Sequence, residues 1–493
     1  MVWFAFCYAV PGRAPFYPLI NGIFKRNIIV YNAVLSQFCT VSAENTPTLS
    51  INKASSSSFR GPCIINGWIK SVKHQSKHSF LHLEDGLSSR HLQVVVPACS
   101  RGNTSLYKFG AAVRVVGNLT DSPASGQSLE IQATEISLLG ANDNENYPFS
   151  KKRYSADYAR QHMHLRSKIP EFAAMLRLRN ACRRAICNYF YRHDFVQIET
   201  PILTSNDCEG AGETFSLAMN KSGNPPYFGN TSDVKLTVSG QLHLETANSG
   251  ISKVFTFGPT FRADHSVDRT HLAEFYMIEG EMSFVEQLEE LLEFVEDFTK
   301  SIIATILENE QEDMAALLRA STSFEPTDLP RYLEKPFQRV TYTDAIKLLQ
   351  SANQQFNAQP DFGNDLHKEH ELYLLQAHDY LPVFVTNWPR SLKPFYMYTN
   401  DDGTAACMDL IVPGPGELVG GSLREHRYDE LNKILSEKHM LEEYRWYLDI
   451  RKFGSAPHAG FGMGFERLLQ FLFGVRQIRD TLPFPRYQNN CRL

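Results

Sequence analysis

The sequence is poor in cysteine and in long apolar runs, and both features limit what the protein can be. Nine cysteines occur among 493 residues, and no two of them form a C-x-x-C pair. This composition argues against a disulfide scaffold and a thiolate zinc site, and it favours a reducing compartment. The longest apolar run near the start, residues 2–10, is far shorter than the roughly 20 residues that span a bilayer. The sequence therefore predicts no membrane partner and no membrane-spanning helix.

An excess of positive charge is also missing. The 49 basic residues are outnumbered by 54 acidic ones, which gives a net charge of −5. We find no internal repeat and no block of like charge. The protein as a whole therefore does not attract polyanions, and a nucleic-acid partner requires a local basic groove.

Acidic residues are absent from the first 43 positions, where Arg13, Lys25 and Arg26 stand among apolar and small residues. Basic, acid-poor leaders are typical of organelle transit peptides. We interpret residues 1–59 as such a leader or a disordered extension, and we predict the mitochondrial matrix as the destination. Another organelle, such as a plastid, and the cytoplasm are the alternatives.

The rest of the chain changes its pattern twice, in agreement with the two to four domains that its length predicts at about 150 residues each. Residues 60–141 are short runs with two-residue alternation between turn residues, typical of a small closed β domain. Residues 142–168 are rich in Lys, Arg, His and Tyr, and we interpret them as a basic hinge. Residues 169–493 combine helical spacing of apolar residues with the two-residue alternation of strands. They include a polar, helical insertion at 310–375 that has no role we can derive. Helices are expected over 172–192, 283–308 and 464–473, and strands over 254–261, 273–279 and 407–412.

Three segments of the larger domain can carry chemistry. The first, HDFVQIETPIL (193–203), is a strand closed by Pro201 and is ordinary by itself. In the second, Arg262 leaves one strand while Glu274 and Phe275 begin the next. A guanidinium suits a phosphate because its planar fork donates two parallel hydrogen bonds, and an aromatic face can stack on a purine. A surface hairpin with rim charges explains this segment equally well.

The third segment combines two carboxylates with glycines. Asp409 and Glu417 lie at the two ends of a strand and turn, and carboxylates that converge in this way can hold Mg²⁺ against phosphate oxygens. A glycine-rich loop over 460–464 allows a ligand to approach the backbone, and Arg467 opens the helix that follows. Each feature is weak evidence by itself.

Together, and in this order, the segments resemble the three signature motifs of class II aminoacyl-tRNA synthetases of the aspartate, asparagine and lysine branch. The resemblance covers residues 62–493 and is closest to asparaginyl-tRNA synthetases of the organellar type. It is carried by TSNDCEGAGETF (204–215), LTVSGQLHLE (236–245), GELVGGSLRE (416–425) and GFGMGFERLLQ (460–470).

The resemblance implies an α+β protein, in which an N-terminal OB-fold β-barrel binds the anticodon. A class II synthetase catalytic domain, an antiparallel sheet flanked by helices, would follow. It also implies ATP-dependent ligation of asparagine to tRNA(Asn) through an asparaginyl-adenylate, with ATP as substrate and Mg²⁺ as cofactor. The first segment would form a homodimer interface.

The resemblance assigns roles to individual residues. Arg262 would hold the α-phosphate and Arg467 the γ-phosphate, and these two and Glu417 would form the catalytic set. Phe275 would stack on adenine, and Asp409 would help Glu417 to hold Mg²⁺. The other implied ATP-binding positions are Asp264, Arg269, His271, Leu272, Glu274, Gly464, Phe465 and Glu466. The implied asparagine-binding positions are Glu209, Ser239, Gln241, Glu279, Gly420 and Arg424, and the implied anticodon-binding positions are Phe80, Gln93 and Lys70.

Departures from the family pattern and two charged residues bear on the choice of substrate and on activity. Aspartate-specific relatives carry a lysine where this chain has Leu244, so no ammonium is available there for a substrate carboxylate. Arg424 can donate to a side-chain oxygen, and Glu279 can accept from an amide, which favours asparagine. Asp264 replaces the usual glutamate and Thr270 the usual arginine, so Arg269 would have to reach the γ-phosphate from one position earlier.

These departures leave alternatives open. One is an aspartyl-tRNA synthetase, including a non-discriminating one. Another is a catalytically silent synthetase paralogue that only binds RNA. An ammonia-using asparagine synthetase shares the catalytic fold, but the attached β domain argues against it.

Overall fold

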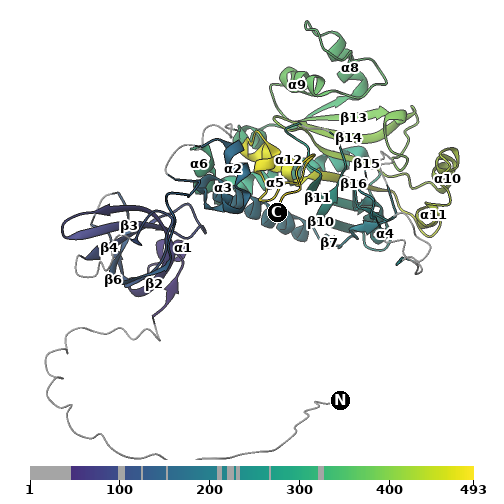
Figure 1. Ribbon diagram of the computed structural model, residues 1–493. Coiled ribbons are helices and arrows are strands. Elements are labelled where there is room, and N and C mark those ends of the chain that lie inside the picture. Colours follow the sequence, from purple (N-terminus) through teal and green to yellow (C-terminus); the bar gives the residue numbers. More distant parts are fainter. Residues whose placement is uncertain are drawn as a thin grey trace, which may run out of the picture. The chain divides into compact units, whose positions relative to one another are not determined.

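The protein is described by a computed structural model (Figure 1). It describes residues 46–97, 106–123, 126–150, 154–207, 214–218, 227–228, 234–265, 268–319 and 327–493. Within these residues, no helix combines the length and the apolar character that crossing a bilayer requires. The predicted leader, residues 1–59, lies outside the described residues as far as residue 45. Its last part belongs to the N-terminal domain instead, where residues 48–49 pair with a strand and the buried Ile51 and Ala54 join the core.

The N-terminal domain is a β-barrel whose apolar residues alternate along each strand. In β3, Ser79, Leu81 and Leu83 are buried, while the residues between them face outward. Strand β2 pairs with both β3 and β5, and this double pairing closes the sheet β1-β2-β3-β4-β6-β5. The predicted small closed β domain is confirmed. Its elements are β1 (Thr48–Leu49), α1 (Ile51–Ser56), β2 (Gly61–His74), β3 (His78–Glu84), β4 (Leu92–Pro97), β5 (Ala112–Asp121) and β6 (Leu129–Gly140).

The second domain is built on an eight-stranded sheet, drawn in Figure 1 as teal to yellow-green arrows. Its order is β12-β13-β14-β15-β16-β11-β10-β7, and only the two end pairs, β12–β13 and β10–β7, are parallel. The strands are β7 (Val196–Gln197), β10 (Lys253–Phe261), β11 (Glu274–Ser283), β12 (Gln338–Thr341), β13 (Val383–Pro389), β14 (Thr404–Val412), β15 (Gly416–Leu423) and β16 (His458–Gly464). A separate pair joins β8 (Leu203–Thr204) to β9 (Lys235–Leu236). The predicted α+β class is confirmed.

Helices cover both faces of this sheet, because alternate strand residues point to opposite sides. Phe384 and Met408 belong to one hydrophobic core, whereas Val385 and Cys407 belong to the other. The first core is covered by α3 (Pro170–Arg192), α5 (Leu288–Asn309) and α12 (Phe465–Phe473). The second is covered by α8 (Tyr342–Gln350), α9 (Lys368–Ala377), α10 (Tyr428–Glu437) and α11 (Arg445–Ile450). The remaining helices are α2 (Ala156–Gln161), α4 (Gln241–Asn248), α6 (Gln311–Leu318), α7 (Leu329–Glu334) and the 3-10 turns η4 (Met163–Lys168), η5 (Arg390–Leu392) and η6 (Ile478–Asp480).

The structure differs from the sequence-based expectations in three segments. The second half of the predicted hinge is helical, and its buried Arg166 donates to Asp480 at 2.8 Å. The predicted helical insertion at 310–375 also contains β12, which extends the main sheet. The expected glycine-rich loop over 460–464 is the central strand β16. Glycine there reflects crowding from the next strand, because a Cβ on Gly460 would lie 2.1 Å from the Glu281 carboxylate.

Candidate active site

The floor of one pocket of the sheet is a single row of residues across four strands. Asp409 on β14 pairs with Gly420 on β15, Gly420 with Gly462 on β16, and Gly462 with Glu279 on β11. Residues directly opposite each other on antiparallel strands project from the same face. The two glycines therefore leave an open floor between two carboxylates. A pocket of about 440 Å³ lies over this row.

One end of the pocket brings together a pair of guanidinium groups and an aromatic ring. Arg262 follows the last residue of β10, and its guanidinium carbon lies 5.7 Å from the centre of the Phe275 ring. Arg467 lies in the first turn of α12, where its Nη1 donates to the Glu417 carbonyl oxygen at 2.8 Å. Its Nη2 lies 3.1 Å from Nε2 of His271. Two planar cations beside a half-buried ring can bind a nucleotide through its phosphates and its base.

Two carboxylates converge at the middle of the pocket. A Cβ on Gly420 would lie 3.5 Å from Oε1 of Glu417 and 3.7 Å from Oδ1 of Asp409, so both oxygens approach the same space. Burial raises the pKa of Asp409 to about 6, and Glu417 adds to the rise while Lys393 opposes it. Nζ of Lys393 donates to Oδ2 of Asp409 at 2.6 Å. Hard carboxylate oxygens next to a phosphate site fit Mg²⁺, which is commonly bound by one or two carboxylates plus substrate phosphates.

The other end of the pocket is a polar wall formed by Ser239, Glu279 and Arg424. The Ser239 hydroxyl donates to Oε1 of Glu279, and the Gly240 amide donates to Oε2 at 2.8 Å. Gln241 begins helix α4, and its backbone amide donates to the Ser239 hydroxyl oxygen at 3.1 Å. The Glu279 carboxylate is thus fixed from two sides, and it presents negative charge to the pocket.

Arg424 forms the opposite side of this wall and opposes the burial that raises the pKa of Glu281 to about 7. It donates to both oxygens of Glu281, from Nη2 at 2.5 Å and from Nε at 3.2 Å, and its Nη1 donates to Ser422 at 2.9 Å. A bidentate pair of this kind fixes both partners in orientation. The wall can therefore bind a small ligand that carries both a hydrogen-bond acceptor and a donor.

This arrangement agrees with the similarity of the chain to known proteins. Residues 155–488 match the family "tRNA synthetases class II (D, K and N)", and residues 63–139 match "OB-fold nucleic acid binding domain". The chain is 45% identical over 444 residues to the asparaginyl-tRNA synthetase of Mus musculus, covering 88% of this chain and 92% of the relative. It is 43% identical over 439 residues to the asparagine–tRNA ligase of Nitratidesulfovibrio vulgaris (strain DP4), covering 86% and 95%.

The chain belongs to the asparaginyl-tRNA synthetase family. It is therefore a ligase that forms aminoacyl-tRNA. Among solved structures it resembles the asparaginyl-tRNA synthetase from Pyrococcus horikoshii complexed with asparaginyl-adenylate. The TM-score is 0.78 and the identity 27%, over 90% of this chain and 99% of that one.

Most of the predicted site residues of the synthetase lie together. Those that line the one pocket are Arg262, Asp264, His271, Leu272, Phe275, Glu417, Gly464, Glu466, Arg467, Ser239, Gln241, Glu279, Gly420, Arg424 and Asp409. Glu274, Arg269 and Phe465 are not among its lining residues. Phe465 is 1% exposed and packs edge-on against Phe257 in the core. Glu209 lies outside the described residues.

Thr270 replaces the arginine that is usual in the family, and Arg269 stands one position earlier. Arg269 is exposed, whereas the buried Thr270 lines the pocket. Nζ of Lys368, the first residue of α9, donates to Oγ1 of Thr270 at 3.2 Å. The Lys368 ammonium group therefore lies next to this part of the pocket wall. Lys368 belongs to the segment 310–375, for which the sequence indicated no role.

Leu244 stands where aspartate-specific relatives carry a lysine. It is fully buried in α4 and is not among the residues that line the pocket. The charged side chains at this end of the pocket are Glu279 and Arg424, and Glu281 pairs with Arg424.

Sequence reasoning missed three buried partners of the predicted residues: Glu281, Lys393 and Glu245. Glu281 could have been found, because it stands two residues after Glu279 on one strand and so shares its face. Glu245 could also have been found, because it stands four residues after Gln241 on one helix, where side chains meet. Lys393 gave no such signal, since its contact with Asp409 depends on the packing of a separate segment.

The predicted anticodon residues lie on neighbouring strands of the barrel. Phe80 on β3 is half-buried and alternates with the buried Ser79 and Leu81, so it is not a core residue. Gln93 on β4 donates to Glu130 at 3.1 Å, and Lys70 on β2 pairs with Glu84 at 3.3 Å. The exposed side of the barrel therefore carries an aromatic ring near polar groups, as a surface that stacks nucleic-acid bases requires.

Proposed function

We propose that the pocket described above catalyses both steps of asparagine ligation to tRNA(Asn). In the first step the asparagine carboxylate attacks the α-phosphorus of ATP, and the bond to the bridging oxygen breaks. The products are asparaginyl-adenylate and pyrophosphate. In the second step the terminal 3′-hydroxyl of the tRNA attacks the activated carbonyl carbon, and AMP leaves. The observation that supports this proposal is the convergence of Arg262, Arg467 and the Asp409–Glu417 pair on one pocket.

No side chain needs to act as a nucleophile in this mechanism. Arg262 binds the α-phosphate and stabilises the negative charge that grows on it, and Phe275 stacks on adenine. Arg467, held by the Glu417 carbonyl oxygen, binds the γ-phosphate. Gln241 and Glu279 orient the amino acid so that its carboxylate faces the α-phosphorus. Positioning and neutralisation of charge supply the rate.

The charges of the wall favour asparagine over aspartate. Arg424 carries one positive charge and is paired with Glu281, while Glu279 adds a negative charge nearby. An aspartate side chain would bring a further carboxylate into this partly desolvated site, which costs several kcal/mol. The asparagine amide adds no charge; its oxygen accepts from Arg424 and its NH₂ donates to Glu279.

The test is ATP–pyrophosphate exchange with each amino acid in turn. We expect exchange that depends on asparagine and is at least about a hundredfold slower with aspartate, as a difference of about 3 kcal/mol predicts. Equal exchange with both amino acids would identify a non-discriminating aspartyl enzyme. No exchange with either, while tRNA still binds, would identify a silent RNA-binding paralogue.

The donor set also supports a magnesium ion, which Asp409 and Glu417 would hold. When bound, the ion neutralises charge on the phosphates. The role of the protein is to keep both carboxylates beside Gly420, with Lys393 restraining Asp409. Removal of divalent ions with EDTA should stop exchange and added Mg²⁺ should restore it; exchange that persists in EDTA would refute this assignment.

Phe80 provides a test of tRNA binding by the barrel. Replacing it with alanine removes a stacking surface worth about 1–3 kcal/mol per base, so kcat/KM for tRNA(Asn) should fall about 5- to 150-fold. Exchange, which uses no tRNA, should be unchanged. Lys53→Ala, an exposed substitution in α1, is the control. A loss of exchange, or unchanged charging of tRNA, would contradict the proposed anticodon surface.

The edge of the sheet supports a homodimer. Strand β7 ends the sheet, and Val196, Ile202 and Leu203 in this segment are 42–45% exposed. A second copy of the chain would cover these apolar side chains. Sedimentation should give about twice the 56.0 kDa of one chain, and Leu203→Lys should shift it toward one chain. A monomeric wild-type protein would refute the interface.

The acid-free composition of residues 1–43 supports a mitochondrial matrix location. A fusion of residues 1–59 to a fluorescent protein should enter mitochondria in cells. A cytosolic or plastid signal would replace this proposal with one of its alternatives.

A further inference from the structure

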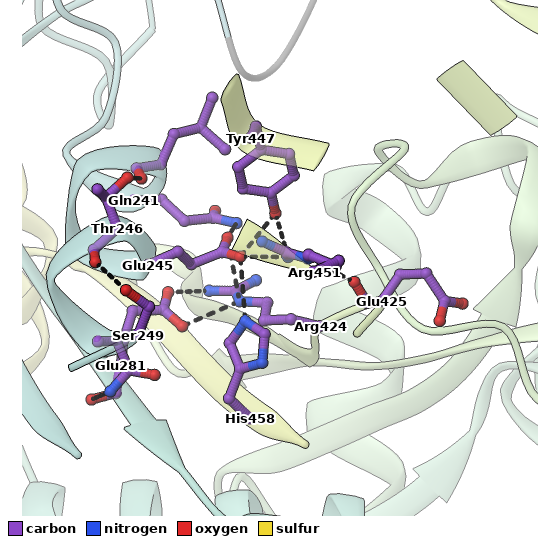
Figure 2. Close-up of polar contacts among 12 residues, drawn as sticks. Gln241, Glu245, Thr246, Ser249, Glu281, Arg424, Glu425, Tyr447, Arg451 and His458 are labelled. Carbon is purple, nitrogen blue, oxygen red and sulfur yellow. Dashed lines mark hydrogen bonds and ion pairs between the residues drawn. The ribbon is translucent and has the colours of Figure 1, made fainter. Parts of the chain in front are cut away.

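A buried polar network lies behind the amino-acid end of the pocket, and Glu245 is at its centre (Figure 2). Glu245 stands one helical turn after Gln241 on α4, and it is 1% exposed. The groups around it come from distant parts of the chain: Arg424 follows β15, Tyr447 belongs to α11, Arg451 follows that helix, and His458 begins β16.

Both oxygens of the Glu245 carboxylate are occupied. Oε2 accepts from the Tyr447 hydroxyl at 2.6 Å, from Nη2 of Arg451 at 2.7 Å and from Nε2 of His458 at 3.1 Å. Oε1 accepts from Nε2 of Gln241 at 3.0 Å. Burial alone would raise the pKa of Glu245, but Arg451 and His458 outweigh it and hold the pKa well below its usual value. The group is thus a carboxylate that can only accept hydrogen bonds.

This property determines how the Gln241 amide lies. A primary amide can be turned by half a rotation, so that either its oxygen or its NH₂ faces a given neighbour. Because Glu245 only accepts, the NH₂ group of Gln241 must face it. The carbonyl oxygen of Gln241, a residue that lines the pocket, is then available to an ammonium group. The reverse orientation would set two oxygen acceptors against each other.

Glu245 also borders the second contact with the amino acid. Its Oε1 lies 4.0 Å from Nε of Arg424, an ion-pair contact, and the hydrogen bonds of Arg424 go to Glu281 and Ser422. Figure 2 shows Gln241 and Arg424 on two sides of the same carboxylate. The buried Glu245 carboxylate therefore contacts both Gln241, the proposed partner of the substrate ammonium, and Arg424, the proposed partner of the substrate side chain.

We propose that Glu245 is a positioning residue for the amino-acid substrate, which it does not touch. It fixes Gln241 with the carbonyl oxygen toward the pocket, and it helps to hold Arg424 in place. The inference rests on the proposed binding of the substrate ammonium by Gln241. It predicts that Glu245 affects the KM for asparagine and leaves the KM for ATP unchanged.

Glu245→Gln is the first test, because the side chain keeps its shape and loses its charge. The new amide can present an NH₂ group to Gln241, which frees that side chain to turn. We expect the KM for asparagine in the exchange reaction to rise about 10- to 100-fold, as loss of a charge-assisted hydrogen bond predicts. The KM for ATP should stay within about twofold, and thermal unfolding reports whether the variant is folded.

A double-mutant cycle with Gln241→Ala separates positioning from a general loss of structure. If Glu245 acts mainly through Gln241, the double variant should bind asparagine almost as well as Gln241→Ala alone. Additive losses, or equal rises of both KM values, would overturn the inference. An unchanged KM for asparagine in Gln241→Ala would instead refute the proposed ammonium site, so the two failures are distinguishable.

Tyr447→Phe covers the case in which Glu245→Gln does not fold. It removes one donor to Glu245 and keeps the ring, and it should raise the KM for asparagine about 3- to 10-fold with the KM for ATP unchanged. Asp297→Asn is the matched control, since Asp297 also accepts from a tyrosine, Tyr189 at 2.6 Å, and lies outside the pocket. An unchanged KM for asparagine in Tyr447→Phe, or an equal rise in Asp297→Asn, would contradict the proposal.

Discussion

Alanine in place of Arg262 is expected to lower asparagine-dependent ATP–pyrophosphate exchange by about a thousandfold or more. In-line attack on the α-phosphorus builds negative charge on oxygens that a guanidinium can neutralise with two parallel hydrogen bonds. Removing one donor of this kind from a preorganised site costs about 10²- to 10³-fold in rate, and removal of an arginine from a phosphoryl-transfer site costs about 10³- to 10⁵-fold. The loss should appear mainly in kcat, since the charge is greatest in the transition state.

The fold should survive this change. The Arg262 backbone amide donates to the Ala273 carbonyl oxygen at 3.0 Å, and alanine keeps that bond. Arg467→Ala should be similarly inactive, although it also removes the contacts with Glu417 and His271. Arg445→Ala is the control, because Arg445 is 69% exposed and its pair with Glu442 is a surface ion pair of little energetic value. Exchange at the wild-type rate in both active-site variants would refute the phosphate assignments.

The sequence predicted the polar residues of this site better than the backbone that positions them. Arg262, Phe275, Glu417 and Arg467 could be placed because their motifs keep a fixed order along the chain, and the structure brings them to one pocket. Strand β16 was predicted as a loop, since glycine is rare in strands and its enrichment usually marks a turn. Gly460 and Gly462 are explained by side chains of the neighbouring strand β11, Glu281 and Met277, which leave no room for a Cβ. Pairing between strands far apart in sequence is not visible in local patterns.

Long-range electrostatic partners were missed for the same reason. Lys393 reaches Asp409 across 16 residues, and Lys368 reaches Thr270 across 98 residues. A lysine in a polar segment is normally a solvated surface residue, so its composition and spacing carry no signal. The sequence identified Thr270 as a departure from the family, but only the packing of α9 places an ammonium beside it.

Gly460→Ala is expected to lower both the stability of the fold and the affinity for asparagine. Alanine there would place a Cβ 2.1–2.2 Å from the carboxyl atoms of Glu281, in the middle of a central strand. Glu281 would have to move and would release Arg424, its bidentate partner. Breaking a buried ion pair costs about 3–5 kcal/mol, so the free energy of unfolding should fall by about that amount in urea. If the variant folds, the KM for asparagine should rise at least about tenfold, because Arg424 loses its orientation.

Gly258→Ala distinguishes this effect from the ordinary cost of changing a strand glycine. Gly258 lies on β10, which pairs with the other edge of β11, and a Cβ on this residue would have Oγ1 of Thr256 as its nearest neighbour, at 3.8 Å. Because that distance is an ordinary contact, alanine should be tolerated there, with the stability and the KM for asparagine near those of the wild type. A Gly460→Ala protein that is equally stable and binds asparagine normally would show that Glu281 has room to move. The rigid Glu281–Arg424 pair, and with it the electrostatic argument for asparagine over aspartate, would then be wrong.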